Sequence, residues 1–250
     1  MLATLTETPG SARPSKVHLL RELLREELVH ADPGARLAAE GELCTRYGES
    51  RNVVRDALEL LRQEGLIARR RGMGTFAMTA RAEHRATTMY FIGEDAGSSV
   101  ARFETIAVEQ IPAPPRAAER LRVDEGAALV SLHRRTWLDD RPFSLQTSLL
   151  PASIAGWLLD RPPDVEWYES LEAGGLALAD AAQVVEATVA DTHVAALLHV
   201  PAGSPVMLIE RLLWLEDGRP AELGMVRCRG DRVGLRVTAA RPHDPTEAGR

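Results

Sequence analysis

Two arginines one helical turn apart open the stretch SRNVVRDALELL at residues 50–61. On a helix of about 100° per residue its apolar side chains share one side, and Arg51, Asn52 and Arg55 lie on the other. Guanidinium groups suit phosphate oxygens and guanine edges, and serine or asparagine side chains can hydrogen-bond phosphates or bases. The alternative is that these charged side chains only face solvent, as most charged stripes on helices do. The residue types therefore indicate either a polyanion-binding surface or a face that contacts only water.

A second basic cluster follows in LIARRRGMGTFAM, residues 66–78. Two extended runs around a Gly-x-Gly turn predict a hairpin whose basic tip is formed by Arg70, Arg71 and Gly72. Between residues 51 and 71 there are six arginines and three acidic residues, whereas the whole chain has a formal net charge of −6. The positive charge is local, which argues against a protein that coats nucleic acid indiscriminately.

Three predicted helices position these arginines. Apolar residues at helical spacing predict a helix over residues 15–28, and a short helix follows over 40–47 with Gly48 as its C-cap. Ser50 is the expected N-cap of the third helix, which ends near Glu64. Three helices and a hairpin predict a winged helix-turn-helix over residues 15–79, a fold in which the third helix enters the DNA major groove.

An internal repeat marks residues 89–245 as a second domain. ERLRVDEGAALVSLHRRTWLDD (119–140) aligns with ALLHVPAGSPVMLIERLLWLED (196–217) at a constant offset of 77 residues. Each copy predicts a helix end, a glycine turn, a strand of about ten residues and a hairpin turn. A further helix is expected in VEWYESLEAGGLAL, between the copies. The chain is therefore expected to be α+β, with an antiparallel sheet built from two related halves.

The remaining segments and composition set broad limits. Residues 80–88 lack apolar periodicity and are expected to form a linker, and residues 1–14 a disordered lead-in without the features of a secretory signal. No apolar run is long enough to span a membrane, so we expect a cytoplasmic protein with no membrane partner. The two cysteines and the histidines have no metal-binding spacing, and neither a metal nor another cofactor is expected.

The stretch LAAEGELCTRYGESRNVVRDALELLRQEGLIARRRGMGTF resembles the DNA-binding domain of the GntR family of bacterial transcription regulators. The family pattern runs approximately LPSE-x-x-LA-x-x-FGVSR-x-TVR-x-AL-x-x-L-x-x-EGL-x-x-R-x-GxGTFV. The second domain is similar to the UTRA effector-binding domain of the HutC-type subfamily, on the stretches LRVDEG, YESLE, VEATVADTHVAALLHVPAGSPVMLIER, DGRPAE and RGDR. This resemblance implies a chorismate-lyase-like fold for the second domain.

The resemblance also implies which residues contact DNA. These are Ser50, Arg51, Asn52 and Arg55 on the recognition helix and Arg70, Arg71 and Gly72 at the wing tip. Three departures from the family pattern precede them: Ala38-Ala39 replaces Pro-Ser, Gly41 replaces a DNA-contacting arginine, and Glu49 replaces a valine. We expect these departures to shift the operator preference and to lower the affinity.

For the effector site, the resemblance implies Arg134, Thr136, Gln146, Glu166, Glu222 and Cys228. The family's Arg-x-Arg pair is reduced here to Arg134 and Thr136, and Glu166 replaces a serine. Because a dianionic phosphate needs at least two convergent donors, these changes predict an effector less anionic than a sugar phosphate. In the alternative interpretation, Arg134 and Glu222 pair with each other or brace the sheet.

The family resemblance implies a ligand-responsive, sequence-specific transcriptional regulator, a homodimer that binds a near-palindromic double-stranded DNA operator and is released by a small-molecule effector. Two alternatives differ in class. A chorismate-lyase-like enzyme would need a catalytic motif, and the chain has no G-x-S-x-G, HExxH or phosphate-binding glycine loop. An effector-independent structural DNA-binding protein would be strongly basic, which this chain is not.

Overall fold

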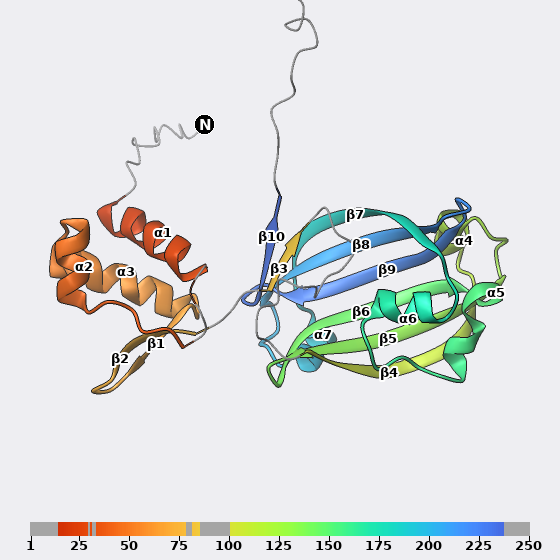
Figure 1. The fold of residues 1–250 in the computed structure, drawn as a ribbon, viewed down its shortest axis with the longest axis horizontal. Coiled ribbons are helices and arrows are strands. Elements are labelled where there is room, and N and C mark those ends of the chain that lie inside the picture. The colour runs from red at the N-terminus through yellow and green to blue at the C-terminus, as the bar shows by residue number, and fades with distance from the viewer. Residues whose placement is uncertain (1–14, 30, 32–33, 79–81, 86–100, 238–250) are drawn as a thin grey trace, which may run out of the picture. The chain divides into compact units, whose positions relative to one another are not determined.

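The computed structural model describes residues 15–29, 31, 34–78, 82–85 and 101–237, and the chain divides into two compact units between Arg81 and Ala82 (Figure 1). The lead-in expected at residues 1–14 lies outside the described residues, as do 80–81, 86–100 and 238–245. None of the described helices combines the length and the apolar character that crossing a bilayer requires.

The first unit contains three helices and a hairpin, as the sequence predicts. They are α1 (Lys16–Val29), α2 (Glu40–Tyr47), α3 (Arg51–Gln63), β1 (Ile67–Arg70) and β2 (Gly74–Ala77). Gly48 ends α2 in the left-handed conformation, at φ 65°. Leucines of α1 pack against the apolar side of α3 to form the core of this unit. This arrangement confirms the predicted winged helix-turn-helix.

The hairpin, which we call the wing, has a third segment beside its two strands. The chain before α2 runs beside β2, where the Leu37 amide donates to the Thr75 carbonyl at 2.9 Å and the Ala77 amide donates to the Ala35 carbonyl at 2.8 Å. At the tip, Gly72 and Gly74 have φ values of 74° and 119°, a region that favours glycine. The segment that leads into α2 is therefore fixed along the wing.

The second unit is built on a six-stranded antiparallel sheet in the order β4-β5-β6-β9-β8-β7. Its first half contains β4 (Ala101–Pro112), α4 (Pro115–Leu121), β5 (Ala128–Leu138) and β6 (Arg141–Pro151). Its second half contains β7 (Leu178–Val189), α7 (Thr192–Leu198), β8 (Pro205–Leu215) and β9 (Pro220–Arg229). The first strand, the helix and the second strand of the first half each recur 77 residues later, which confirms the predicted repeat. The two halves meet where β6 pairs with β9.

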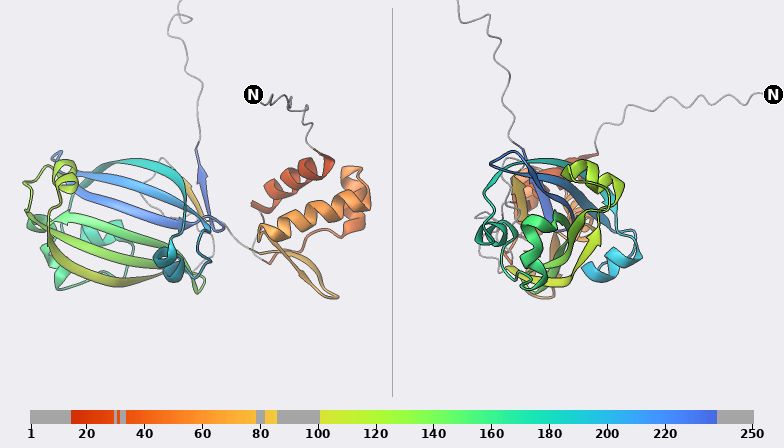
Figure 2. Two further views of the ribbon diagram at one scale, coloured as in Figure 1. Left: turned by 180° about the vertical axis from the view of Figure 1, so that it is seen from behind. Right: turned by 90° about the vertical axis from the view of Figure 1, so that its right-hand side faces the viewer.

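Helices cover both faces of this sheet (Figures 1 and 2). On one face, α5 (Ala152–Ala155), a 3-10 turn (Gly156–Leu159) and α6 (Trp167–Ala173) pack over β5, β6 and β8. On the other face lie α4 and α7, which occupy equivalent places in the two halves. The helix predicted between the repeats is α6, and Gly174 follows its last residue.

One expectation is wrong. Residues 82–85, predicted as part of a linker, form strand β3 (Ala82–Arg85), which pairs in parallel with β10 (Val233–Arg236). The pairing partner lies about 150 residues later in the chain, so no local pattern could indicate it. Strand β3 belongs to the second compact unit.

Candidate nucleic-acid interface and effector pocket

The packing of α3 determines which of its side chains reach the surface. Ser50 caps the helix, its Oγ accepting from the Val53 amide at 3.4 Å. Val54, Ala57, Leu58 and Leu61 are at most 2% exposed, and they anchor one side of the helix. Because that side is buried, Arg51, Asn52 and Arg55 are exposed at its amino end. These predicted positions therefore form one accessible face.

The arginines differ in their partners. Arg62 forms an ion pair with Glu59 at 2.5 Å, and Arg69 contacts Glu40. Within the described residues, Arg51, Arg55 and Arg71 make no ion pair. A surface guanidinium without a carboxylate partner keeps its hydrogen-bond donors available for phosphate. We call the predicted set the basic surface: Ser50, Arg51, Asn52, Arg55, Arg70, Arg71 and Gly72.

A groove beside the wing adds a residue that sequence reasoning missed. It lies between residues 36–40 and 69–75 and is lined by Arg36 together with Arg69, Arg70 and Arg71. Arg36 crosses over Gly74, where a Cβ atom would lie 3.0 Å from the Arg36 Nε. The position of Arg36 depends on the pairing of its segment with β2, and for that reason its sequence neighbours do not reveal it.

In the second unit, a small cavity of about 30 Å³ that opens to solvent lies where α6 meets the sheet. Its lining includes four of the six predicted effector residues: Arg134, Thr136, Gln146 and Glu166. Sequence reasoning did not find the remaining lining residues: Phe103, Ser144, Trp167, Tyr168, Arg211 and Val226. The cavity is therefore polar at its charged end and aromatic along α6.

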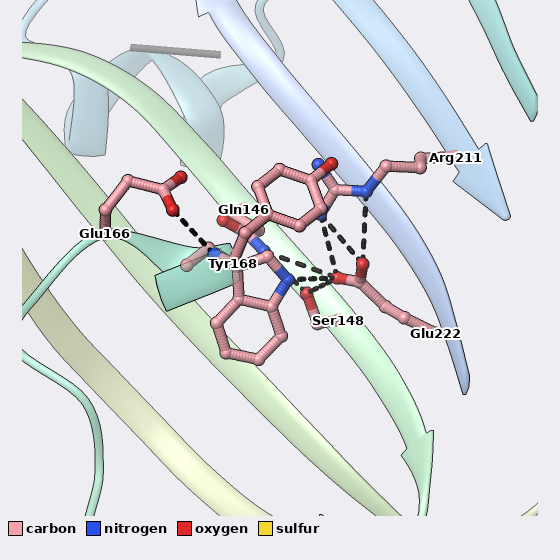
Figure 3. A network of polar contacts seen from close by, with 7 residues as sticks. Gln146, Ser148, Glu166, Tyr168, Arg211 and Glu222 are labelled. Carbon is pink, nitrogen blue, oxygen red and sulfur yellow. Dashed lines mark hydrogen bonds and ion pairs between the residues drawn. The ribbon is translucent and has the colours of Figure 1, made fainter. Parts of the chain in front are cut away.

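Glu222 lies beneath this cavity at the centre of a hydrogen-bond network (Figure 3). Its carboxylate is fully buried and accepts from the Arg211 guanidinium at 2.8–3.1 Å. It also accepts from the Trp167 indole at 2.8 Å and from the Ser148 hydroxyl. The alternative in which Glu222 pairs with Arg134 is therefore wrong, because its ionic partner is Arg211.

Arg211 also corrects the prediction that the pocket has a single arginine. It lies on β8 at the position that the repeat makes equivalent to Arg134 on β5, and both side chains line the cavity. The repeat alignment pairs these two arginines, so the signal for the second one was present in the sequence. Its charge is nevertheless balanced, since the bidentate contact with Glu222 leaves no net charge on the pair.

Arg134 has a different environment. It is 2% exposed, donates to the Val165 carbonyl, and has its guanidinium carbon 5.2 Å from the Phe103 ring and 5.4 Å from the Trp167 ring. Its Nε makes no hydrogen bond within the described residues. Burial lowers the pKa of Arg134 to about 10, against the attraction of nearby carboxylates. The side chain is a buried cation without a direct carboxylate contact.

Glu166 is the N-cap of α6. Its Oε2 accepts from the Tyr168 amide at 2.7 Å and from the Glu169 amide at 3.2 Å, which satisfies two donors at the helix start. Burial raises the pKa of its carboxyl, while these hydrogen bonds and Arg134 lower it. Glu166 therefore brings a carboxylate to the same cavity as Arg134.

Cys228 is placed differently from the prediction. It lies in an apolar cluster with Leu138, Phe143 and Ile209, is fully buried, and is not among the residues that line the cavity. Burial raises the pKa of its thiol well above the ordinary value. Cys228 therefore does not line the cavity, unlike four of the other predicted effector residues.

Two family models match this chain. Residues 17–77 match the model described as bacterial regulatory proteins of the gntR family, and residues 97–234 match the UTRA domain. The chain belongs to the GntR family. The combination of the two domains is that of the HutC-type subfamily, whose members are DNA-binding transcriptional regulators and not enzymes.

Individual proteins that are similar to this GntR regulator support the same family. It is 30% identical to the HTH-type transcriptional regulator Rv0792c of Mycobacterium tuberculosis, over 92% of this chain and 88% of the relative. It is 28% identical to the HTH-type transcriptional repressor NagR of Bacillus subtilis, over 85% and 90%. The crystal structure of PhnF from Mycobacterium smegmatis has a TM-score of 0.65 at 24% identity and covers 89% of this chain and 100% of that one, which supports the fold. The α+β fold class is thus confirmed.

Proposed function

We propose that this regulator is a repressor that binds a near-palindromic operator as a homodimer and leaves it when a small molecule binds in the cavity of the UTRA domain. Each copy would place α3 in the major groove and the wing tip against the backbone of one half-site. The observation that carries the DNA-binding part is that Arg51, Arg55 and Arg71 are exposed and make no ion pair with any described residue, whereas Arg62 and Arg69 of the same unit have carboxylate partners.

Within the basic surface, we propose two kinds of contact. Arg51, Asn52 and Arg55 would read base edges and nearby phosphates, because they stand at the exposed amino end of α3. Arg70 and Arg71 would bind phosphate beside Gly72, where the chain has no Cβ to hold the backbone away from DNA. Arg36 would add a phosphate contact from its groove along the wing.

The cavity at Arg134 is the proposed effector site. A ligand there can control DNA binding only to the extent that it favours one dimer arrangement over another. The buried Arg134 and the capping residue Glu166 are the two charged groups that a ligand would meet, because Arg211 is occupied by Glu222. This charge balance supports an effector less anionic than a sugar phosphate.

The test begins with a binding sequence selected by the protein from a random duplex library. Fluorescence anisotropy then compares the wild type with Arg51→Ala, Arg55→Ala and Arg62→Ala. Arg62 is the matched control, since it lies on the same helix but pairs with Glu59. We expect the first two variants to bind at least about tenfold more weakly and to lose base preference, as each bidentate contact contributes about 1–3 kcal/mol. Equal behaviour of all three variants would contradict the assigned surface.

A further inference from the structure

We infer that the effector is a small zwitterion, with one carboxylate bound by Arg134 and one ammonium group bound by Glu166 of the same cavity. This inference rests on the proposed function, because it assumes that the cavity is the effector site. It adds the chemical class of the ligand and assigns Glu166 the role of excluding dianions.

The first step concerns the N–H donors of Arg134 that make no hydrogen bond within the described residues. A guanidinium has five N–H donors, and within the described residues Arg134 uses one of them in a hydrogen bond, to the Val165 carbonyl. The side chain is 2% exposed, so its remaining donors have little contact with bulk water. A buried cation is costly unless it is paired and hydrogen-bonded. A ligand carboxylate offers two oxygens in the geometry that a guanidinium fork prefers.

The second step limits the ligand to one negative charge. Arg211 lines the same cavity, but three hydrogen bonds commit it to Glu222. Gly224 allows this close pairing, because a Cβ there would lie 2.9 Å from the Glu222 Oε1 and 3.4 Å from an Arg211 nitrogen. A ligand anion therefore meets one cation of the lining that has no direct carboxylate contact among the described residues, Arg134.

The third step is the carboxylate of Glu166. The hydrogen bonds from the Tyr168 and Glu169 amides both end on Oε2, and Figure 3 shows the first of them. In our proposal, Oε1 accepts from the ligand. An ionised carboxylate only accepts hydrogen bonds. It therefore attracts an ammonium group and repels the second charge of a phosphate monoester, most strongly where water is excluded.

The fourth step is the balance of charge. The cavity's two arginines and two associated carboxylates, Glu166 and Glu222, balance in charge, so a ligand that is neutral overall preserves this balance. Thr136, Ser144 and Gln146 add polar groups along the lining. Together these features fit a small ligand that carries one anionic and one cationic group.

The experiment uses the full chain in a thermal-shift screen, followed by calorimetry. The probes are the twenty standard amino acids, β-alanine and γ-aminobutyrate, tested singly, with glucose 6-phosphate as the phosphate monoester. We expect at least one zwitterion to raise the melting temperature and glucose 6-phosphate to leave it unchanged. Stabilisation by none of the zwitterions, or stronger stabilisation by glucose 6-phosphate, overturns the inference.

Two variants test Glu166 itself. Glu166→Ser keeps an N-cap oxygen for α6, and Glu166→Gln keeps the size, so each removes the charge with a different effect on packing. We expect either variant to weaken zwitterion binding about tenfold or more, the loss typical of one charged hydrogen bond, and to admit glucose 6-phosphate. An unchanged order of ligands in both variants overturns the role of Glu166.

Measurements of DNA binding distinguish a failure of the inferred ligand class from a failure of the proposed function. A phosphate monoester that binds the wild type and releases it from its selected duplex overturns the zwitterion class and leaves the regulatory function standing. A zwitterion that binds with the expected dependence on Glu166 but never changes DNA affinity supports the chemistry of the site and overturns its role in release.

Discussion

Arg134 and Arg211 occupy equivalent positions in the two halves of the UTRA sheet, 77 residues apart, and one of them alone contacts a carboxylate directly. Both side chains are almost fully buried, at 2% and 4% exposure, and both line one cavity. The repeat therefore places two cations together, and Glu222 on β9 neutralises one of them. Arg134, in contrast, has no direct contact with a carboxylate of the described residues, and its charge is the basis of the ligand class inferred above.

This difference predicts unequal losses of stability for two similar substitutions. Arg211→Gln leaves Glu222 buried without its ionic partner, and we expect the unfolding free energy of the UTRA unit to fall by about 3–5 kcal/mol. Arg134→Gln removes a cation that has no direct carboxylate contact, so its loss should be smaller. Urea unfolding followed by tryptophan fluorescence measures this unit selectively, because all four tryptophans lie in it. Equal losses in the two variants would contradict the assigned pairing.

Local signals in the sequence predicted much of this structure. The bounds of α2, the glycine after it and the Ser50 cap follow from short-range rules of helix formation. The 77-residue repeat predicted the symmetric sheet because each half carries its own turn and strand pattern. What the sequence could not indicate depends on distant pairing: strand β3 forms only beside β10, and Arg36 is placed by residues of β2.

The residues of the candidate pocket also include some that the sequence predicted and some that it could not. Arg134, Thr136, Gln146 and Glu166 were found by family resemblance and do line the cavity. Cys228 lies on the same strand as Glu222, but its side chain is fully buried in an apolar cluster and does not line the cavity. Motif matching does not distinguish such a position from a binding position. The partner of Glu222 follows from side-chain geometry, which a pattern of residue types does not contain.

Gly224 provides a steric test of the buried ion pair. Gly224→Ala introduces a Cβ at 2.9 Å from the Glu222 Oε1, so the carboxylate or the strand must shift. We expect an unfolding free energy lower by about 1–3 kcal/mol, as for other overpacked sites. Gly156→Ala is the control, because nothing lies within 4 Å of its added Cβ and its φ of −57° suits alanine. A Gly224→Ala protein as stable as this control would show that the pair tolerates displacement.

The two helix caps of the DNA-binding unit predict changes of opposite sign. Ser50→Ala removes the hydroxyl that accepts from the Val53 amide, and we expect α3 to lose about 1 kcal/mol of local stability. Ala39 occupies the N-cap of α2 without a side-chain hydrogen bond to the helix, so Ala39→Ser should stabilise α2 by a similar amount. Amide hydrogen exchange of the full chain measures both helices separately. Slower exchange in α2 of Ala39→Ser is the decisive result, and an unchanged rate there contradicts the prediction.

The pKa of Glu166 predicts a pH dependence. Burial raises this pKa above its ordinary value of 4.5, so between the two values the folded state binds more protons than the unfolded state. The stability of the wild type should therefore fall, relative to Glu166→Gln, as the pH rises from 4.5 through the raised pKa. The measurement is urea unfolding of the wild type and of Glu166→Gln over a pH series. All other titrating groups are the same in the two proteins, so their difference in stability reports on Glu166. A constant difference between the two proteins would contradict the raised pKa.

The wing predicts a change in the salt dependence of DNA binding. Arg71→Ala and Arg36→Ala should each reduce the slope of log K against log salt by about 0.9, since each guanidinium that contacts a phosphate displaces one condensed counterion. Arg62→Ala should leave the slope unchanged, because its guanidinium is paired with Glu59. Anisotropy titrations on the selected duplex at several salt concentrations give the three slopes. A wild-type slope in Arg36→Ala would exclude Arg36 from the interface, and a wild-type slope in Arg71→Ala would mean that the wing tip does not contact the DNA backbone.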